Sequence, residues 1–335
     1  MKTISQKLWS RPPHLEWAEP VVVNPARNNH THTMILLHTM HSNGDKFGKE
    51  FMKSSQISNH FPTTKFIFPT AQLSRAKEQG LFGLRMPQWF ACGGVLRSIE
   101  GCEEQEEGLK EDGNYIRALI ADEARRLDDL NLPTQNRGYD RIILGGLGQG
   151  CAASIIVALG LHQTLGGFVG MSGWLPFELD LEYELDDELK QRAAKKVGIN
   201  EKLKEKEGMK KPSNENDTAP NHIRAIDLIC DIIDVEQVDK DPGLAPNSGM
   251  AGFKWEPHAP QLDTPVFLGH AHAEDQADIA RGRKMRTLLE ALRMRIVWRE
   301  YSQLGHSSNV PGEIDDIVNF LELEVAIPRK RKLRT

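Results

Sequence analysis

The chain has 335 residues, 39% of them hydrophobic, and a formal net charge of −5 at pH 7. The mildly acidic balance argues against a general nucleic-acid-binding surface, and no stretch approaches the ~18 apolar residues that a membrane-spanning helix requires. Because the start lacks the apolar run of a signal peptide, and four cysteines show no metal-type pairing and are too few for a disulfide scaffold, we expect a reduced, cytoplasmic protein. The cysteines are Cys92, Cys102, Cys151 and Cys230.

Strand-like and helix-like segments alternate along the chain. Residues 1–30, rich in Pro, Asn and His, are expected to form an irregular lead-in to one domain over 31–327. Short apolar runs bounded by turn residues predict strands at 34–38, 65–69, 141–144, 167–171, 265–269 and 296–301. Apolar residues at helical spacing predict helices at 103–130, 149–159, 279–294 and 313–324. This alternation predicts a mostly parallel sheet with helices on both faces.

Residues 178–262 interrupt the alternation and are expected to form a surface insertion. Its central part is nearly all polar and cannot bury enough apolar surface to offset the entropy cost of ordering, so mobility is expected at about 195–222. A lid over a binding site and a solvated loop are equally compatible with this composition. The basic tail, 328–335, is expected to be solvated, with a nuclear targeting signal as the alternative.

The segment from Asp140 to Ser154 reads DRIILGGLGQGCAAS. It predicts a strand, a glycine-rich turn and the start of a helix, which is the layout of the nucleophile elbow Gly-x-Ser-x-Gly. Glycine occupies the central position, Gly148, where that motif has its serine. Without a side chain at this residue there is no hydroxyl to give up a proton, so no acyl-enzyme can form there.

Other interpretations of this segment are weaker. The spacing from Gly148 to Ala153 matches a dinucleotide fingerprint, but the next strand ends without the acidic residue that would bind the ribose, so no cofactor is expected. Cys151 lies near a helix N-terminus, which lowers a thiol pKa. However, Cys151 and Ser154 both fall inside the helix, and a buried cysteine is usually inert packing.

Several histidines follow predicted strands, and the carboxyl ends of the strands are where sites gather in open α/β sheets. One hypothesis is that they rim one pocket and serve acid–base chemistry or bind a transition metal. The more economical hypothesis is that they point in different directions and satisfy loop hydrogen bonds, and we predict no metal site. The histidines are His38, His41, His270, His272 and His306.

Several segments together resemble the acyl-protein thioesterase and carboxylesterase family, in its fungal-like form with an insertion. They occur in the family's order, cover nearly the whole chain from about residue 30 to 325, and combine the elbow with a late Asp and a Gly-His pair. The segments are LLH at 36–38 followed by SNG at 42–44, QWF at 88–90, ILGGLGQGCA at 143–152, GWLP at 173–176, FLGH at 267–270 with Asp275, and LGH at 304–306.

The resemblance implies an α/β-hydrolase fold and a site with defined roles. By position, Asp275 and His306 match the family's orienting carboxylate and general base, and Gly148 stands where its serine is. The family's His-Gly-x-Gly loop reads His-Thr-Met-His here, so both flexible glycines are replaced. The implied oxyanion positions are Thr39, Met40 and Gln149, and the implied pocket residues are His38, His41, Trp89, Trp174 and His270.

The resemblance also implies substrates or ligands that are small acyl esters or lipidated proteins. Because Gly148 replaces the nucleophile, we expect serine-hydrolase activity to be lost or much reduced, and Gly148→Ser to restore only part of it. One alternative is a non-hydrolytic binding or scaffold protein that uses the inherited surface. Another is a repurposed enzyme in which His306 and Asp275 act as base and orienter on a different substrate.

Overall fold

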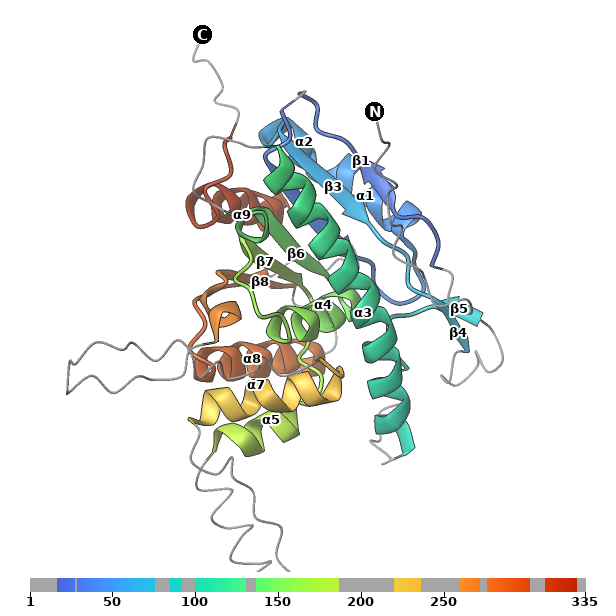
Figure 1. The fold of residues 1–335 in the computed structure, drawn as a ribbon, viewed down its shortest axis with the longest axis vertical. Helices are drawn as coiled ribbons and strands as arrows, with labels where there is room; N and C mark the ends of the chain where they lie inside the picture. The colour runs from blue at the N-terminus through green and yellow to red at the C-terminus, as the bar shows by residue number, and fades with distance from the viewer. Residues whose placement is uncertain are drawn as a thin grey trace, which may run out of the picture.

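The computed structural model describes residues 17–27, 29–75, 85–91, 100–130, 137–186, 220–235, 259–271, 276–301 and 311–329. Its centre is a seven-stranded sheet whose strands are β1 (Val21–Val23), β2 (His32–Leu37), β3 (Thr64–Phe68), β6 (Ile142–Leu147), β7 (Gly167–Met171), β8 (Val266–Ala271) and β9 (Ile296–Tyr301). They are ordered β1-β3-β2-β6-β7-β8-β9 (Figure 1). Only the edge strand β1 runs antiparallel to its neighbour, so the predicted mostly parallel sheet is confirmed.

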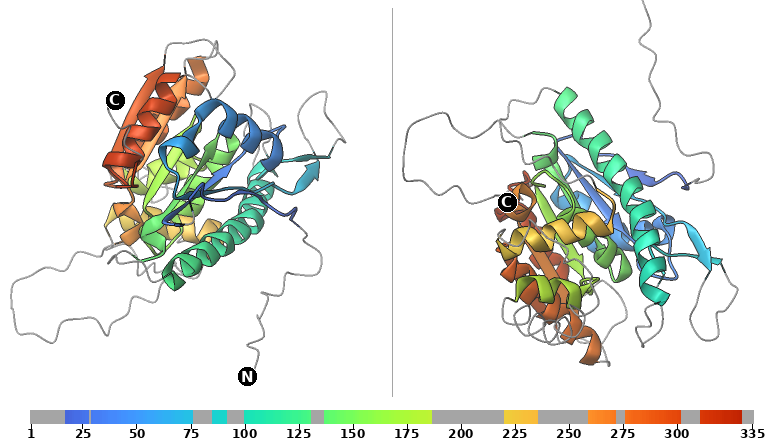
Figure 2. Two further views of the ribbon diagram at one scale, coloured as in Figure 1. Left: turned by 90° about the horizontal axis from the view of Figure 1, so that it is seen from above. Right: turned by 60° about the horizontal axis from the view of Figure 1, so that its bottom comes forward.

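Helices cover both faces of the sheet (Figures 1 and 2). The described helices are α1 (Gly44–Ser55), α2 (Ile57–His60), α3 (Glu100–Asp129), α4 (Gln149–Leu159), α5 (Glu178–Leu185), α7 (Asn221–Ile232), α8 (Gln276–Ala291) and α9 (Pro311–Leu323). Apolar residues of α1, α2 and α9 pack on one face, and those of α3, α4 and α8 on the other. Within the described ranges, no helix combines the length and apolar character needed to cross a lipid bilayer.

The central strands read as continuous apolar runs because both of their faces are buried. Every residue of β2 is buried. Its side chains alternate, with Ile35 and Leu37 in the cluster beneath α3 and α4, and Met34 and Leu36 in the cluster beneath α1 and α9. This burial explains why apolar runs in the sequence located β2, β3, β6, β7 and β8.

The described part of the insertion forms two helices packed on the domain. α5 lies against α7 and α8, and α7 also contacts α4 (Figure 1). Ile226 and Ile229 of α7 are buried in the same core cluster as α4. Helix α7 begins at Asn221 and so includes the last two residues of the stretch expected to be mobile. Residues 187–219 and 236–258 lie outside the described residues.

Four other elements differ from the sequence predictions. β1 lies within residues 1–30, which were expected to be irregular. Its three valines form a strand because they pair with β3 at the sheet edge. β4 (Leu73–Arg75) and β5 (Arg85–Pro87) form a small separate sheet. Helix α1 was not predicted, although Asn43 caps it by accepting a 2.8 Å hydrogen bond from the Lys46 amide.

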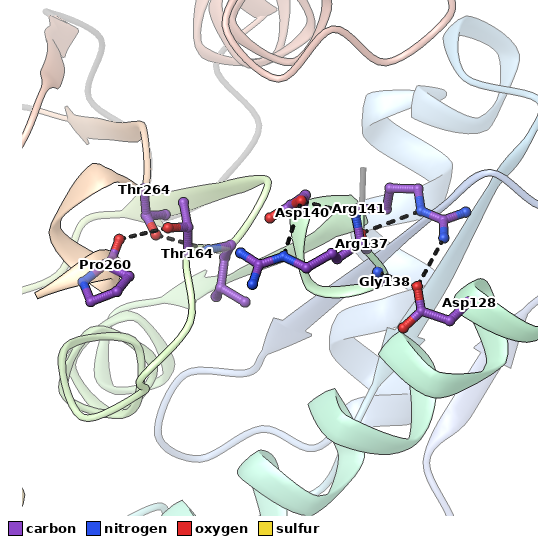
Figure 3. Close-up of polar contacts among 9 residues, drawn as sticks. Asp128, Arg137, Gly138, Asp140, Arg141, Thr164, Pro260 and Thr264 are labelled. Carbon is purple, nitrogen blue, oxygen red and sulfur yellow. Dashed lines mark hydrogen bonds and ion pairs between the residues drawn. The ribbon is translucent and has the colours of Figure 1, made fainter. Parts of the chain in front are cut away.

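Polar contacts fix the loop that enters β6 at the end opposite the elbow (Figure 3). The Asp128 carboxylate accepts a 2.6 Å hydrogen bond from the Gly138 amide. The Arg141 guanidinium donates to the Leu127 carbonyl at 2.9 Å and lies 3.4 Å from Asp128. Nearby, the Thr164 hydroxyl donates to the Pro260 carbonyl at 2.7 Å. The first two sets of contacts tie α3 to the start of β6, and the third joins the loop after α4 to the segment before β8.

Helix α4 approaches the sheet closely because glycines face β2. A Cβ on Gly146 would lie 2.7 Å from the Leu37 carbonyl oxygen. A Cβ on Gly150 would meet the carbonyl oxygens of Leu37 and His38, the latter at 2.5 Å. Since backbone atoms cannot rotate away as a flexible side chain can, these two positions exclude any larger residue unless α4 moves off the sheet.

We predict that Gly150→Ala destabilises the fold by about 1–3 kcal/mol, the usual cost of overpacking. The matched control is Gly113→Ala in α3, where a new Cβ would make an ordinary 3.7 Å contact with Val157. This control is expected to stabilise by roughly 0.5–1 kcal/mol, because alanine favours helix. Urea unfolding of both variants checks the prediction, and equal midpoints would contradict it.

Candidate active site

The turn between β6 and α4 has the geometry of a nucleophile elbow. Gly148 has φ 56° and ψ −117°, a backbone conformation that residues with a Cβ rarely adopt. Its amide donates a 2.9 Å hydrogen bond to the Met171 carbonyl at the end of β7, and its carbonyl accepts from the Ala152 amide at 3.1 Å. The sharp turn is therefore held from both sides.

A neighbouring side chain fills the space beside this turn. A Cβ built on Gly148 would lie 2.5 Å from Thr39 Oγ1 and 3.3 Å from Thr39 Cβ. Thr39 follows β2, which is the strand next to β6 in the sheet. The structure thus brings two sequence-predicted site residues, Gly148 and Thr39, into direct proximity.

His38 is a structural residue of the loop after β2. It is fully buried, with Nδ1 2.8 Å from the Thr39 carbonyl oxygen and Nε2 3.1 Å from the Ala71 amide. A carbonyl can only accept and an amide can only donate, so the ring is neutral with its proton on Nδ1. Burial lowers the pKa of His38 to about 4. With both nitrogens engaged, His38 is not available as a general base. Sequence analysis placed His38 in the pocket, but the structure buries it below the surface.

Gln149 connects the start of α4 to the segment around Trp89. Its Oε1 accepts from the Trp89 amide at 3.1 Å, and its Nε2 donates to the Phe90 carbonyl at 2.8 Å. Trp89 is fully buried and donates its indole N–H to the His38 carbonyl at 2.8 Å. Trp89 therefore belongs to the core beneath the site rather than to an exposed pocket wall. Sequence reasoning assigned Gln149 only a backbone role and missed this side-chain clamp.

The predicted oxyanion positions gather around the elbow. Gln149 is the first residue of α4, where backbone N–H groups have no partner within the helix. Thr39 and Met40 are half-buried in the adjoining loop. His41, which replaces the second glycine of the family loop, adopts φ 60° and approaches Met86 Sδ with Nδ1 at 3.3 Å. His41 therefore adopts a left-handed backbone conformation that glycine adopts more readily.

The alternative nucleophiles inside α4 are both buried. Cys151 has no exposed surface, and a Cβ on Gly170 or Gly173 would collide with its sulfur, which shows how tightly the thiol is enclosed. Burial raises the pKa of the Cys151 thiol to about 12. Ser154 is also fully buried, and its hydroxyl donates to the Cys151 carbonyl at 3.0 Å. A substrate at the surface can therefore reach neither side chain.

Trp174 and His270 occupy different parts of the same sheet edge. Trp174 is half-buried after β7, and its ring meets that of Phe90 edge-on with centroids 6.3 Å apart. His270 is buried at the end of β8, with Nδ1 3.2 Å from the Ala271 carbonyl oxygen and its ring against Trp298. Since two strands separate β2 from β8, His38 and His270 lie on the order of 14 Å apart.

Asp275, His306 and His272 lie outside the described residues. The strands that precede them, β8 and β9, run parallel to β6, so their carboxyl ends lie at the same sheet edge as the elbow. Among the described residues, no group of three or more His, Cys, Asp or Glu side chains could hold a metal ion.

A buried carboxyl near this edge was missed by sequence reasoning. Glu313, in the first turn of α9, is 2% exposed, and burial followed by the nearby Asp316 raises its pKa to about 7. Its Oε1 faces Gly269 of β8 and has no hydrogen-bond partner in the described part of the chain. An acidic residue in the first turn of a helix is usually exposed, so nothing in the sequence distinguishes the buried Glu313 from an exposed one.

The lowered pKa of His38 predicts a pH dependence of folding. Because its pKa is about 6.5 unfolded and about 4 folded, its contribution is complete above pH 6.5 and is lost as the pH falls toward 4. His38→Phe should cost about 1–3 kcal/mol at pH 7 through the unpaired Thr39 carbonyl and Ala71 amide. The unfolding free energy of the His38→Phe variant should also fall less between pH 7 and pH 5 than that of the wild type. His32, whose pKa is likewise lowered to about 4, keeps some dependence. Parallel pH profiles would contradict this assignment.

The enclosure of Cys151 predicts that it resists alkylation. In the folded protein at pH 8, iodoacetamide should leave Cys151 unmodified, because the thiolate is nearly absent and the sulfur is inaccessible. The same residue should react fully in urea. Peptide mapping by mass spectrometry gives the modified fraction. Rapid alkylation of Cys151 in the folded protein would contradict the prediction and make Cys151 a candidate nucleophile.

Comparison with known proteins identifies relatives with this architecture. The family model described as Phospholipase/Carboxylesterase matches residues 18–190. Acyl-protein thioesterase 1 of Yarrowia lipolytica is 34% identical over 161 residues, which are 48% of this chain and 64% of that protein, less than two thirds of its length. Acyl-protein thioesterase 1 of Gibberella zeae is 24% identical over 307 residues, covering 91% of this chain and 95% of the relative.

A solved structure agrees with the fold. The crystal structure of Zea mays acyl-protein thioesterase 2 aligns over 92% of this chain and 99% of its own, with a TM-score of 0.54 and 18% sequence identity. The α/β-hydrolase fold expected from the resemblance is thereby confirmed. The family match covers more than half of the chain and includes β6, the elbow and α4. The chain belongs to the phospholipase/carboxylesterase family.

Proposed function

We propose that this chain is an acyl-protein thioesterase-like protein that binds acyl esters or thioesters and has lost most or all serine-hydrolase activity. The observation that carries the proposal is Gly148, which holds the elbow conformation with no side chain. A serine hydrolase forms its acyl-enzyme through a hydroxyl activated by an imidazole. At the elbow of this chain there is no atom that can form that bond.

Cys151 and Ser154 in α4 and the buried His38 offer no substitute for the missing group. Cys151 and Ser154 are enclosed in α4, and His38 is held neutral by two backbone contacts. Removing the nucleophile of a serine hydrolase costs about 10⁶ in kcat and leaves roughly 10³–10⁴ over water from the oxyanion hole and binding. The proposal therefore allows a slow residual reaction with water but no covalent intermediate at residue 148.

Ligand binding is proposed for the surface around Trp174. This tryptophan is half-buried, contacts Phe90 and follows the strand next to β6. Aromatic side chains provide a large apolar area for an acyl chain. A small-molecule acyl ester or a lipidated protein is the proposed ligand, and Asp275 with His306 remains the proposed base and orienter for any residual chemistry.

A covalent probe tests the loss of the nucleophile. After incubation with a fluorophosphonate, we expect no adduct at residue 148, Cys151 or Ser154 in peptide maps of the wild-type protein. Hydrolysis of p-nitrophenyl butyrate should stay close to the buffer rate. A stoichiometric adduct together with fast turnover would overturn the proposal, because the chain would then possess a working nucleophile.

Binding is measured separately with a non-hydrolysable acyl thioether. A ligand that binds only the native state must raise the melting temperature, and Trp174→Ala should reduce this shift. Leu323→Ala, at a site on α9 that is 77% exposed, is the control that should leave the shift unchanged. A shift that is equally large in all three proteins would exclude the surface around Trp174. No shift at all would favour the scaffold alternative.

A further inference from the structure

The contact between Thr39 and Gly148 joins two segments that lie far apart in the sequence. Thr39 Oγ1 is 2.5 Å from the position of a Cβ on Gly148, and Thr39 Cβ is 3.3 Å from it. Carbon and oxygen atoms that are not bonded do not approach within 3.0 Å without movement. The threonine hydroxyl therefore lies in the space that a side chain at residue 148 would need.

We propose that Thr39 acts as a plug that fills the nucleophile position, so that Thr39 and Gly148 together close the elbow. This inference deepens the proposed function, on which it rests, by assigning the inactive state to a pair of residues. Gly148 removes the nucleophile, and Thr39 occupies the space left behind. A serine at residue 148 then fits only if Thr39 is removed, or if its side chain or loop is displaced at a cost in stability.

The surroundings of Thr39 make its displacement difficult. Threonine is β-branched, so rotation about χ1 replaces the hydroxyl by either a methyl group or a hydrogen, and only the hydrogen leaves room. The Thr39 carbonyl is held by His38, and the His38 carbonyl is held by the Trp89 indole. The loop is thus fixed on both sides of the plug and cannot easily carry Thr39 away.

A rival explanation is that the Thr39 hydroxyl is itself a replacement nucleophile. The geometry favours the plug, because the Thr39 hydroxyl lies 2.5 Å from the Cβ position of Gly148 and the described imidazole next to it in the chain cannot activate it. That imidazole, His38, is neutral and engaged at both nitrogens. The fluorophosphonate experiment below distinguishes the two explanations by the residue that is labelled.

The test uses wild type, Gly148→Ser, Thr39→Gly, Thr39→Gly/Gly148→Ser and Thr39→Val/Gly148→Ser. Valine keeps the bulk of threonine and removes its hydroxyl, so it is the matched control for volume. Because a misplacement of 1 Å can cost on the order of 10²-fold in rate, fluorophosphonate labelling of the serine introduced at residue 148 should be about 10²-fold faster in the Thr39→Gly double variant than in Gly148→Ser. The Thr39→Val double variant should stay as slow as Gly148→Ser.

A second readout does not depend on catalysis. Gly148→Ser should lower the urea midpoint in both backgrounds through backbone strain, and lower it further in the Thr39 background, where the collision adds to the strain. This cycle decides the matter even if no variant is labelled. The plug is overturned if the two substitutions have additive effects on the midpoint, or if Gly148→Ser alone is labelled as fast as the double variant. Labelling of the wild-type protein at Thr39 would overturn both the plug and the proposed function. If the wild type is unlabelled and the two substitutions have additive effects on the urea midpoint, only the plug is overturned.

Discussion

The close approach of α4 to β2 and β6 is the constraint on which the rest of the structure depends. Gly146 and Gly150 leave room for the Leu37 and His38 carbonyls, so the helix can begin directly above the sheet edge. This approach forces the sharp turn at Gly148 and buries α4 along its whole length. It also places the loop after β2 beside the turn. The packing of the core and the geometry of the candidate site therefore both require α4 to lie close to the sheet.

The elbow is retained without the residue that gives it a catalytic purpose. A serine at φ 56° and ψ −117° would store about 1–3 kcal/mol of backbone strain. Glycine adopts this conformation freely, so the turn persists because of packing alone. Around it, His38, Trp89 and Gln149 form a buried and neutral hydrogen-bonded set. The result is an elbow that lacks the serine hydroxyl at residue 148, with the Thr39 hydroxyl in the space beside it.

Sequence patterns located the features that depend on local order and continuous burial. The strands from β2 to β9 in the large sheet, the helix at 149–159 and the elbow were all visible because apolar runs and glycine spacing are local signals. β1 was missed because three valines form too short a run for a periodicity, and α7 because a polar stretch precedes it. The contact between Thr39 and Gly148 depends on the pairing of β2 with β6 and could not be read from either segment alone. The buried state of His38 and Trp89 has the same origin.

A crystal structure of the Gly148→Ser variant tests the central claim most directly. The account predicts that the introduced serine keeps a positive φ and the backbone hydrogen bond to the Met171 carbonyl, and that Thr39 changes its χ1 rotamer or the loop at 38–41 shifts away from the turn. The account is contradicted if the introduced serine is accommodated with Thr39 and its loop in their original positions, since the space beside the elbow would then never have been closed.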